Sequence, residues 1–296
     1  MDRKLFLKSL SIIPVAAVFM KLNELYKVTE TFSPTQRMPV LFLGHGSPMN
    51  AIEENEFVKG FRALGKTLPK PKAILCISAH WETNGTFVTA MAKPKTIHDF
   101  GGFPQALFDV QYPAPGSPSL ANETKLLIQK TTVGLDENWG LDHGCWSVIK
   151  HLYPNADIPV IQMSLDYYKA APYHYELAKE LTALRNKGVL IVGSGNMVHN
   201  LGLVAWDKLN SSNYAFDWAT EASEKLKKFI LEGDHKSLID YKSQGKAMNL
   251  AIPSPDHFLP LLYSLALQSK NDTLSLFNDK AVGGSLTMTS LKIEAS

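Results

Sequence analysis

Four short apolar runs, separated by segments with helical patterns, constrain the fold of this chain more than any other feature. The runs are Val40–Leu43, Lys72–Ser78, Ile158–Ser164 and Val189–Val192. Runs of this length are typical of buried strands. The segments Met49–Leu68, Ser147–Tyr153 and Pro172–Lys187 between them are predicted to be helices. This alternation predicts an α/β fold, with a mostly parallel central sheet flanked by helices.

Composition narrows the class of protein. The chain has 296 residues, 45% of them apolar and 20% charged, which is typical of a soluble globular protein. The net charge is +2 with Lys and Arg scattered along the chain, so we expect no nucleic-acid partner. The two cysteines, Cys76 and Cys145, form no CxxC pair, which excludes a thiolate zinc site and a disulfide framework.

The first 37 residues differ from the rest of the chain. Asp2-Arg3-Lys4 precedes an apolar stretch from Leu10 to Met20, an order that resembles an export signal with a weak twin-arginine-like start. The alternative is an amphipathic helix that packs on the domain, so a cytoplasmic and a periplasmic location both stay open. The stretch is too short for an ordinary transmembrane helix. No linker or repeat divides residues 38–296, which we predict to be one catalytic domain.

Four histidines occupy comparable positions. His45, His80 and His199 each follow a predicted strand, and His257 begins a predicted helix. Ligands gather at the carboxyl ends of strands in open α/β sheets, and imidazole is a common ligand of zinc and iron. The four residues therefore predict a mononuclear metal site. Three other histidines are predicted at exposed helical positions or turns, as bystanders: His151, His174 and His235.

Two loops have unusual compositions. Lys93–Ser117 is rich in Pro, Gly and aromatic residues, and a loop of this length is usually functional. Its aromatic side chains either wall a pocket for a flat ring or anchor a covering loop: Phe100, Phe103, Phe108 and Tyr112. His98 is ambiguous for the same reason. Gly134–Trp146 is predicted to be a second loop, which carries His143.

Five motifs occur in order along the chain: GHGSPM at Gly44–Met49, SAHWE at Ser78–Glu82, LDHGCW at Leu141–Trp146, GSGNMVHNL at Gly193–Leu201 and PDHFLPL at Pro255–Leu261. Together they resemble the class III extradiol ring-cleavage dioxygenases, and specifically the DOPA 4,5-dioxygenase-like branch. The resemblance runs from about Met38 almost to the C-terminus. It implies an α/β fold with one metal at the carboxyl edge of the sheet, and oxygen-dependent opening of a catechol ring, such as that of DOPA, beside its hydroxyls.

The resemblance also implies roles for individual residues. His45, His80 and His257 match the metal ligands of the family. His199 matches a fourth active-site histidine, either a further ligand or the acid–base residue, and His143 matches a histidine that faces substrate and dioxygen. One divalent metal ion per chain is implied, with ferrous iron for activity and zinc able to occupy the site, and dioxygen as co-substrate. Three neutral ligands should leave the metal more positive than two histidines and a carboxylate would.

Two other classes of function stay open. A zinc-dependent hydrolase with metal-bound water would need a carboxylate base, for which Glu82 and Asp256 are candidates because each adjoins a proposed ligand. Either carboxylate could instead hydrogen-bond a ligand histidine and fix its tautomer. The third class is a non-catalytic protein that binds aromatic compounds under the Lys93–Ser117 loop. The sequence leaves the oligomeric state undecided.

Overall fold

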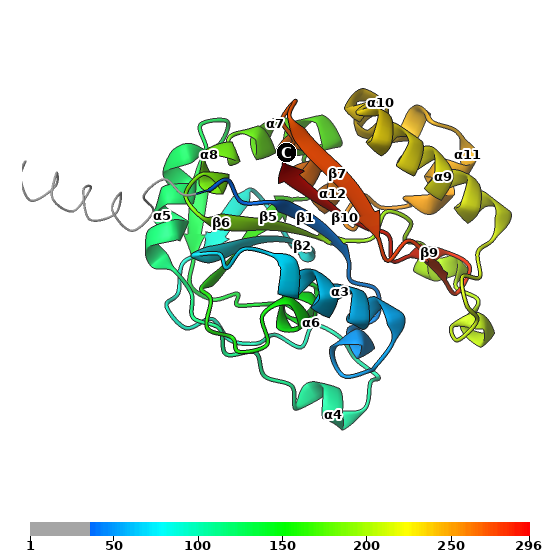
Figure 1. Ribbon diagram of the computed structural model, residues 1–296, viewed down its shortest axis with the longest axis horizontal. Coiled ribbons are helices and arrows are strands. Elements are labelled where there is room, and N and C mark those ends of the chain that lie inside the picture. The colour runs from blue at the N-terminus through cyan, green and yellow to red at the C-terminus, as the bar shows by residue number, and fades with distance from the viewer. Residues whose placement is uncertain (1–35) are drawn as a thin grey trace, which may run out of the picture. The chain divides into compact units, whose positions relative to one another are not determined.

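The computed structural model describes residues 36–296, which form an α/β domain around one large sheet (Figure 1). The predicted export signal and its alternative, a packed amphipathic helix, lie outside these described residues. No helix within residues 36–296 has both the length and the apolar character needed to cross a membrane.

Within the described residues, eight strands pair in the order β4-β3-β5-β2-β6-β1-β10-β7. Their bounds are β1 Val40–Gly44, β2 Ala73–Thr83, β3 Thr86–Thr89, β4 Val133–Asp136, β5 Val160–Asp166, β6 Val189–Gly195, β7 Asp272–Phe277 and β10 Ser290–Ala295. The central strands β5, β2, β6 and β1 are parallel, and antiparallel pairs lie toward both edges. The predicted mostly parallel sheet is confirmed.

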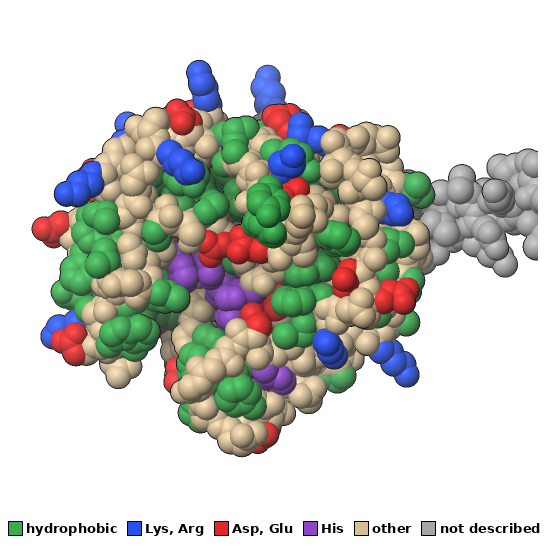
Figure 2. Space-filling model, turned by 180° about the vertical axis from the view of Figure 1, so that it is seen from behind, with side chains coloured by type: hydrophobic (Ala, Val, Ile, Leu, Met, Phe, Trp, Pro, Cys, Tyr) green, Lys and Arg blue, Asp and Glu red, His purple; other side chains and the backbone are tan. Residues whose placement is uncertain are grey.

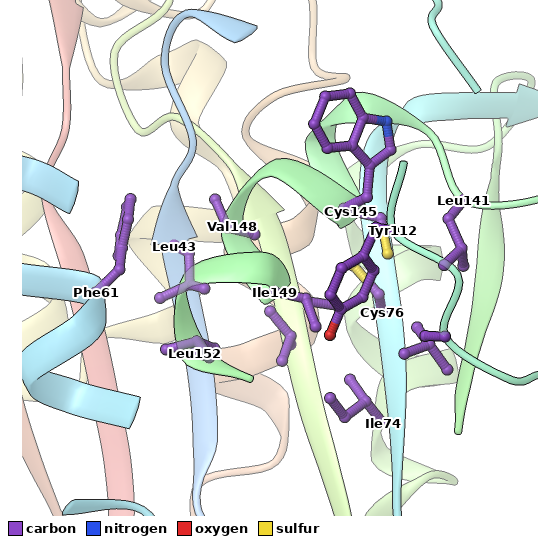
Figure 3. Packing of buried hydrophobic residues seen from close by; sticks show 14 of the residues in the cluster. Leu43, Phe61, Ile74, Cys76, Tyr112, Leu141, Cys145, Val148, Ile149 and Leu152 are labelled. Atoms are coloured by element: carbon purple, nitrogen blue, oxygen red, sulfur yellow. The ribbon is translucent and has the colours of Figure 1, made fainter. Parts of the chain in front are cut away.

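Helices cover both faces of the sheet. On one face, α3 (Glu56–Thr67) and α6 (His143–Leu152) pack on the apolar side chains of β1 and β2. Figure 3 shows residues of α6 that point toward Leu43 of β1 and Ile74 of β2. The helix α12 (Leu259–Ala266) covers the other face. It lies very close to β6, since a Cβ added to Gly193 of β6 would be 2.3 Å from the carbonyl oxygen of Pro260.

Several element boundaries differ from the predicted ones. The predicted helix Met49–Leu68 is a 3-10 turn, η1 (Pro48–Ala51), followed by α3, which begins where the Asn55 side chain accepts a hydrogen bond from the Val58 backbone N–H. The predicted helix Pro172–Lys187 is two helices, α7 (Ala171–Lys179) and α8 (Thr182–Arg185). The predicted closing strand Leu286–Ile293 is divided into β9 (Leu286–Thr287) and β10.

The remaining elements are short or lie at the periphery. They are α4 (Gln105–Phe108), α5 (Pro118–Leu127), η2 (Leu201–Leu203), η3 (Trp206–Lys208), α9 (Asp217–Glu232), α10 (His235–Ile239), η4 (Tyr241–Ser243), α11 (Lys246–Ala251) and β8 (Ala281–Val282). The strand β8 pairs with β9 in a small separate sheet. Cys76 and Cys145 are buried free thiols, in agreement with the absence of a predicted disulfide.

Candidate metal centre

Three histidine rings meet at the carboxyl edge of the central strands. His45 follows β1, His80 lies in β2 and His257 precedes α12. Their ring centroids are 5.0, 5.2 and 5.1 Å apart in the three pairs, which makes a nearly equilateral triangle. The Nε2 atoms of His45 and His80 are 3.2 Å apart, close to the spacing that two ligands with bonds of about 2 Å to one ion require.

The local backbone explains the position of His45. Gly44 at the end of β1 pairs with Gly195 at the end of β6, and the His45 N–H donates to the Gly195 carbonyl at 3.1 Å. Gly46 then adopts φ +62°, a conformation that favours glycine and turns the chain sharply away from the sheet. Ser47 caps η1 and Pro48 begins it.

The other two ligand candidates reach the same point by different routes. The sequence predicts that the second strand ends at Ser78, but β2 continues through His80 to Thr83 with an irregular register between Ile77 and Glu82. That irregularity turns the His80 ring toward β1. His257 is held by its own backbone, because its carbonyl accepts a hydrogen bond from the Asn196 N–H at 2.9 Å, just after β6.

The second ring nitrogen of each histidine has a partner. His45 Nδ1 lies 3.0 Å from Ser194 Oγ, which donates its own proton to the Gly144 carbonyl and so must accept from the imidazole. His257 Nδ1 contacts the Asp256 carboxylate, and His80 Nδ1 lies 3.2 Å from Asp99 Oδ2. Protons on all three Nδ1 atoms leave the three Nε2 lone pairs free, which is the donor set a metal ion needs. The residues therefore fit a divalent metal ion.

Asp99 is the residue of this centre that sequence reasoning missed. Its Oδ2 also lies 3.0 Å from His143 Nδ1, and its Oδ1 accepts a hydrogen bond from the His143 backbone N–H at 2.8 Å. Burial alone would raise the pKa of the Asp99 carboxyl, but the contacts with His143 and His80 outweigh burial and hold the pKa well below its usual range. No motif marks a lone aspartate in an aromatic loop, so only the fold reveals this contact.

His143 and His199 flank the three central rings on different sides. The His143 ring lies 3.9 Å from that of His80, whereas the His199 ring stacks on that of His257 at 3.5 Å with planes 6° apart. The sequence predicted a loop around His143, but it is the first residue of α6, after the buried N-cap residue Asp142. Burial, with a smaller effect from His257, lowers the pKa of His199 to about 3, so its imidazole is neutral near pH 7.

The five histidines line one cavity of about 790 Å³. Figure 2 shows histidine side chains within a hollow of the surface, with acidic side chains beside them. Of the aromatic residues in the Lys93–Ser117 loop, Phe103 lines this cavity. The other three do not line it: Phe100 packs behind it against His143 and His98, Phe108 contacts His98, and the Tyr112 hydroxyl donates to the Tyr153 carbonyl. The loop therefore contributes one aromatic side chain to the cavity wall, while its other aromatic side chains anchor the loop.

The remaining histidines lie outside the cluster. His98 Nε2 lies 2.9 Å from the Val110 carbonyl and its ring packs among aromatic rings, which is a structural role. The prediction of exposed positions for His151 and His174 is wrong, since both side chains are buried. His151 contacts the Asn50 carbonyl, and His174 contacts the Tyr263 hydroxyl, so local hydrogen bonds explain their burial. His235 is partly buried beside the Tyr175 hydroxyl.

The two candidate carboxylate bases differ in their surroundings. Asp256 contacts His257 Nδ1, which matches the tautomer-fixing role rather than that of a hydrolytic base. The contacts with His257 hold the pKa of Asp256 below its usual range against the opposing effect of burial. Glu82 is exposed at the end of β2. Because Asp99 and Asp256 carry negative charge beside the ligand candidates, they offset the charge that three neutral imidazoles would leave on a divalent ion.

Three histidines that could hold a metal ion at the carboxyl edge of a parallel sheet, beside two further histidines in a cavity, are typical of a metal-dependent α/β enzyme. Comparison with known proteins identifies the family. Residues 39–285 match the family described as the catalytic LigB subunit of aromatic ring-opening dioxygenase, and the chain belongs to this family. It is thus an extradiol-type, metal-dependent dioxygenase that opens aromatic rings, and the resemblance seen in the five motifs is confirmed.

Individual relatives agree with this assignment. A protein of Escherichia coli K12 named 4,5-DOPA dioxygenase extradiol is 45% identical over 270 residues, which cover 90% of this chain and 98% of the relative. A Beta vulgaris protein of the same name is 35% identical over 261 residues, 86% of this chain and 96% of that protein. A crystal structure of an uncharacterised E. coli K12 protein superposes with a TM-score of 0.75 at 41% identity, covering 87% of this chain and 100% of the other.

Proposed function

We propose that His45, His80 and His257 hold one divalent metal ion, ferrous iron in the active enzyme, and that residues 38–296 use it to open a catechol ring by 4,5-cleavage. The observation that carries the proposal is the convergence of three imidazoles with ring nitrogens within 4.8 Å of one another, each with its Nδ1 atom in contact with Ser194, Asp99 or Asp256. The names of the E. coli and B. vulgaris relatives support DOPA as a member of the substrate class. When bound, iron would supply the electron transfer between catechol and dioxygen that a protein side chain cannot.

His199 is the base in this proposal. Its neutral imidazole lines the cavity and can accept a proton from a catechol hydroxyl as the substrate binds. An anionic catecholate beside the ring would raise the pKa of the imidazole and help it retain that proton. The stacking contact with His257 places His199 directly beside a ligand candidate, so proton removal would occur next to the metal.

His143 acts on the dioxygen side. Its Nδ1 lies 3.0 Å from Asp99 Oδ2, so in this proposal Nε2 is the atom that receives a proton and returns it. Because His143 and His199 lie next to different ligand candidates, one can serve the catechol while the other serves dioxygen.

The test is reconstitution with ferrous iron without oxygen, followed by a catechol and air. We expect one dioxygen consumed per catechol and a yellow ring-opened product. Zinc-loaded protein should bind the catechol but consume no oxygen, since zinc has no redox chemistry. His45→Ala is the control and should lose both metal and activity while its circular dichroism is unchanged. Absence of oxygen uptake with several catechols, or stoichiometric metal in His45→Ala, would refute the proposal.

Zinc-dependent hydrolysis is the weaker alternative. It predicts turnover by the zinc-loaded protein under nitrogen, which the dioxygenase proposal excludes. Membership of the ring-opening dioxygenase family and the engagement of Asp256 with His257 both argue against it.

A further inference from the structure

The cavity is larger than a catechol ring needs. Its volume of about 790 Å³ lies in the range that holds drug-sized ligands, ~300–1,000 Å³. Besides the histidines, its lining includes Asn50, Phe57, Leu201, Trp206 and Leu209. The substrate therefore has room for a substituent on the ring, and lining residues other than the histidines would contact it.

Apart from the histidines, the ionisable side chains of the described residues that line the cavity are all acidic. They are Glu53 and Glu56, and among the described residues no Lys or Arg lines the cavity. Glu56 pairs with the Lys280 ammonium, so its charge is compensated. Glu53 is exposed at the mouth and is the carboxylate left to act on a ligand. Its neighbour Glu54 pairs with Arg62 and does not line the cavity.

The charge near the histidines does not reverse this balance. Asp99 and Asp256 together offset the charge of one divalent ion, and both lie beside ligand candidates. A bound catecholate adds further negative charge. A substituent that carries a carboxylate would therefore meet no compensating cation in the cavity and would be repelled, whereas a cationic substituent would be attracted. In Figure 2, acidic side chains lie directly beside the histidines in the hollow.

Trp206 adds a second feature suited to a cation. Its side chain lines the cavity and is 67% exposed, an unusual position for an indole. The face of an indole attracts an ammonium group, and a carboxylate that lines the same cavity, such as that of Glu53, adds to that attraction. Leu201 and Leu209, which also line the cavity, would contact the methylene groups that join the ammonium to the ring.

From these features, and resting on the proposed ring-opening function, we propose that the preferred substrates are catechols with an ammonium-bearing side chain, bound at the mouth by Glu53 and Trp206. An amino acid side chain offers the same ammonium but adds a carboxylate that the cavity does not compensate. The order of preference is therefore the amine first, the amino acid next and the acid last.

The experiment compares three catechols of matched shape with the iron-loaded protein. They are 4-(2-aminoethyl)catechol, neutral 4-ethylcatechol and 3-(3,4-dihydroxyphenyl)propanoate. We expect kcat/KM for the amine to exceed that for the acid by about tenfold at low salt, with the neutral compound between them. Added salt should reduce the ratio, because exposed charges are screened. DOPA should rank below the amine and above the acid.

Three variants test the assignment to residues. Glu53→Gln should reduce the amine-to-acid ratio by about threefold or more, and Trp206→Leu should reduce the amine-to-ethyl ratio by about threefold. Glu54→Gln is the matched control, because it removes the adjacent charge outside the cavity and should leave both ratios unchanged. Equal or better cleavage of the acid, or an equal effect of Glu54→Gln and Glu53→Gln, would overturn the inference.

Failure of the proposed function can be distinguished from failure of this inference. If 4-ethylcatechol is not oxidised, the dioxygenase proposal fails and the ligands are compared by calorimetry with the metal-loaded protein under nitrogen. Tighter binding of the amine than of the acid then supports the inference, and equal or weaker binding overturns it.

Discussion

At the scale of single residues, Asp99 has a combination of contacts that the other partners lack. Ser194 and Asp256 each contact one ligand candidate, whereas the Asp99 carboxylate contacts both His80 and His143. A change at Asp99 should therefore affect metal affinity and the action of His143 together. A change at Asp256, which contacts His257 and lies near His199, should affect metal affinity but not the action of His143.

Asp99→Asn should weaken metal binding by roughly 10- to 100-fold, as expected when a partner that orients a ligand histidine is lost. Chelator competition measures this effect without reference to activity. Asp256→Asn should weaken binding to a similar degree and serves as the matched control.

A double-mutant comparison separates the two roles. Once iron is saturating, the effects of Asp99→Asn and His143→Ala on kcat should be non-additive, because both act on the same imidazole. The effects of Asp256→Asn and His143→Ala should add. Additive effects for the Asp99 pair would show that Asp99 acts only through the metal.

At the scale of elements, the close approach of β6 to the His257 loop fixes one corner of the metal centre. A Cβ on Gly195 would lie 2.1 Å from the His257 carbonyl oxygen, so only glycine fits there without movement of the loop. The neighbouring backbone hydrogen bond between Asn196 and His257 depends on the same approach.

Gly195→Ala should therefore displace His257 and lower metal affinity at least tenfold, with a cost in folding stability of ~1–3 kcal/mol, typical of overpacking. Calorimetric metal titration and urea unfolding provide the two measurements. Gly202→Ala is the control, since the nearest atom to its Cβ is 3.4 Å away in a side chain. An unchanged metal affinity in Gly195→Ala would contradict the assignment of His257 as a ligand.

The packing of α7 on α12 contains a buried histidine that links stability to pH. His174 Nε2 lies 3.2 Å from the Asp166 carbonyl and Nδ1 lies 3.0 Å from the Tyr263 hydroxyl, so the neutral ring satisfies both contacts. Burial is the largest cause that lowers the pKa of His174, to about 4. The unfolded chain, with a pKa near 6.5, therefore binds a proton more readily than the folded protein between these two values.

Stability should consequently be retained above pH 6.5 and should fall as the pH drops from about 6.5 toward 4. The contribution of His174 to the loss between pH 7.5 and pH 5 is about 2 kcal/mol. Urea unfolding of His174→Gln and of the unaltered protein at both pH values measures it, because the variant should lose less stability over this interval. An identical loss in the two proteins would assign the pH dependence to other buried histidines.

The elements also show what the sequence can and cannot specify. Apolar runs predicted the positions of β1, β2, β5 and β6, because a buried strand needs apolar side chains on both faces. The sequence did not predict that α6 starts at His143. The helix begins with polar and small residues, and its N-cap residue, Asp142, is fully buried. Such a start resembles a loop until the tertiary contacts of Asp142 with Ser78 and Gln162 are known.

At the scale of the whole molecule, the sheet brings together histidines that are remote in sequence. The alternation of strands and helices predicted the α/β class, and motifs identified His45, His80, His257, His143 and His199. The strand order β2-β6-β1 that makes these residues neighbours depends on long-range pairing, which no local pattern encodes. Asp99 and the lining of the cavity could not be predicted for the same reason, because both depend on where a long loop packs.

Metal binding should stabilise the molecule as a unit, because the ligand candidates come from β1, β2 and the segment before α12. A metal at 100 times its dissociation constant adds ~2.7 kcal/mol to the unfolding free energy, which corresponds to a rise in Tm of roughly 5–10 °C for a domain of this size. Scanning calorimetry with and without zinc or ferrous iron measures the shift. His45→Ala should show none, and a full shift in that variant would place the metal elsewhere.

The pairing of β1 with β10 has a consequence for biosynthesis. The first strand of the described domain takes its neighbour from the last, Ser290–Ala295, and His257 lies in the final part of the chain. A ribosome therefore releases His45 and His80 long before the third ligand candidate and the strand that flanks β1 exist. Metal would be acquired only after both have been synthesised, so the ion that the protein obtains depends on which metals surround the chain at that stage.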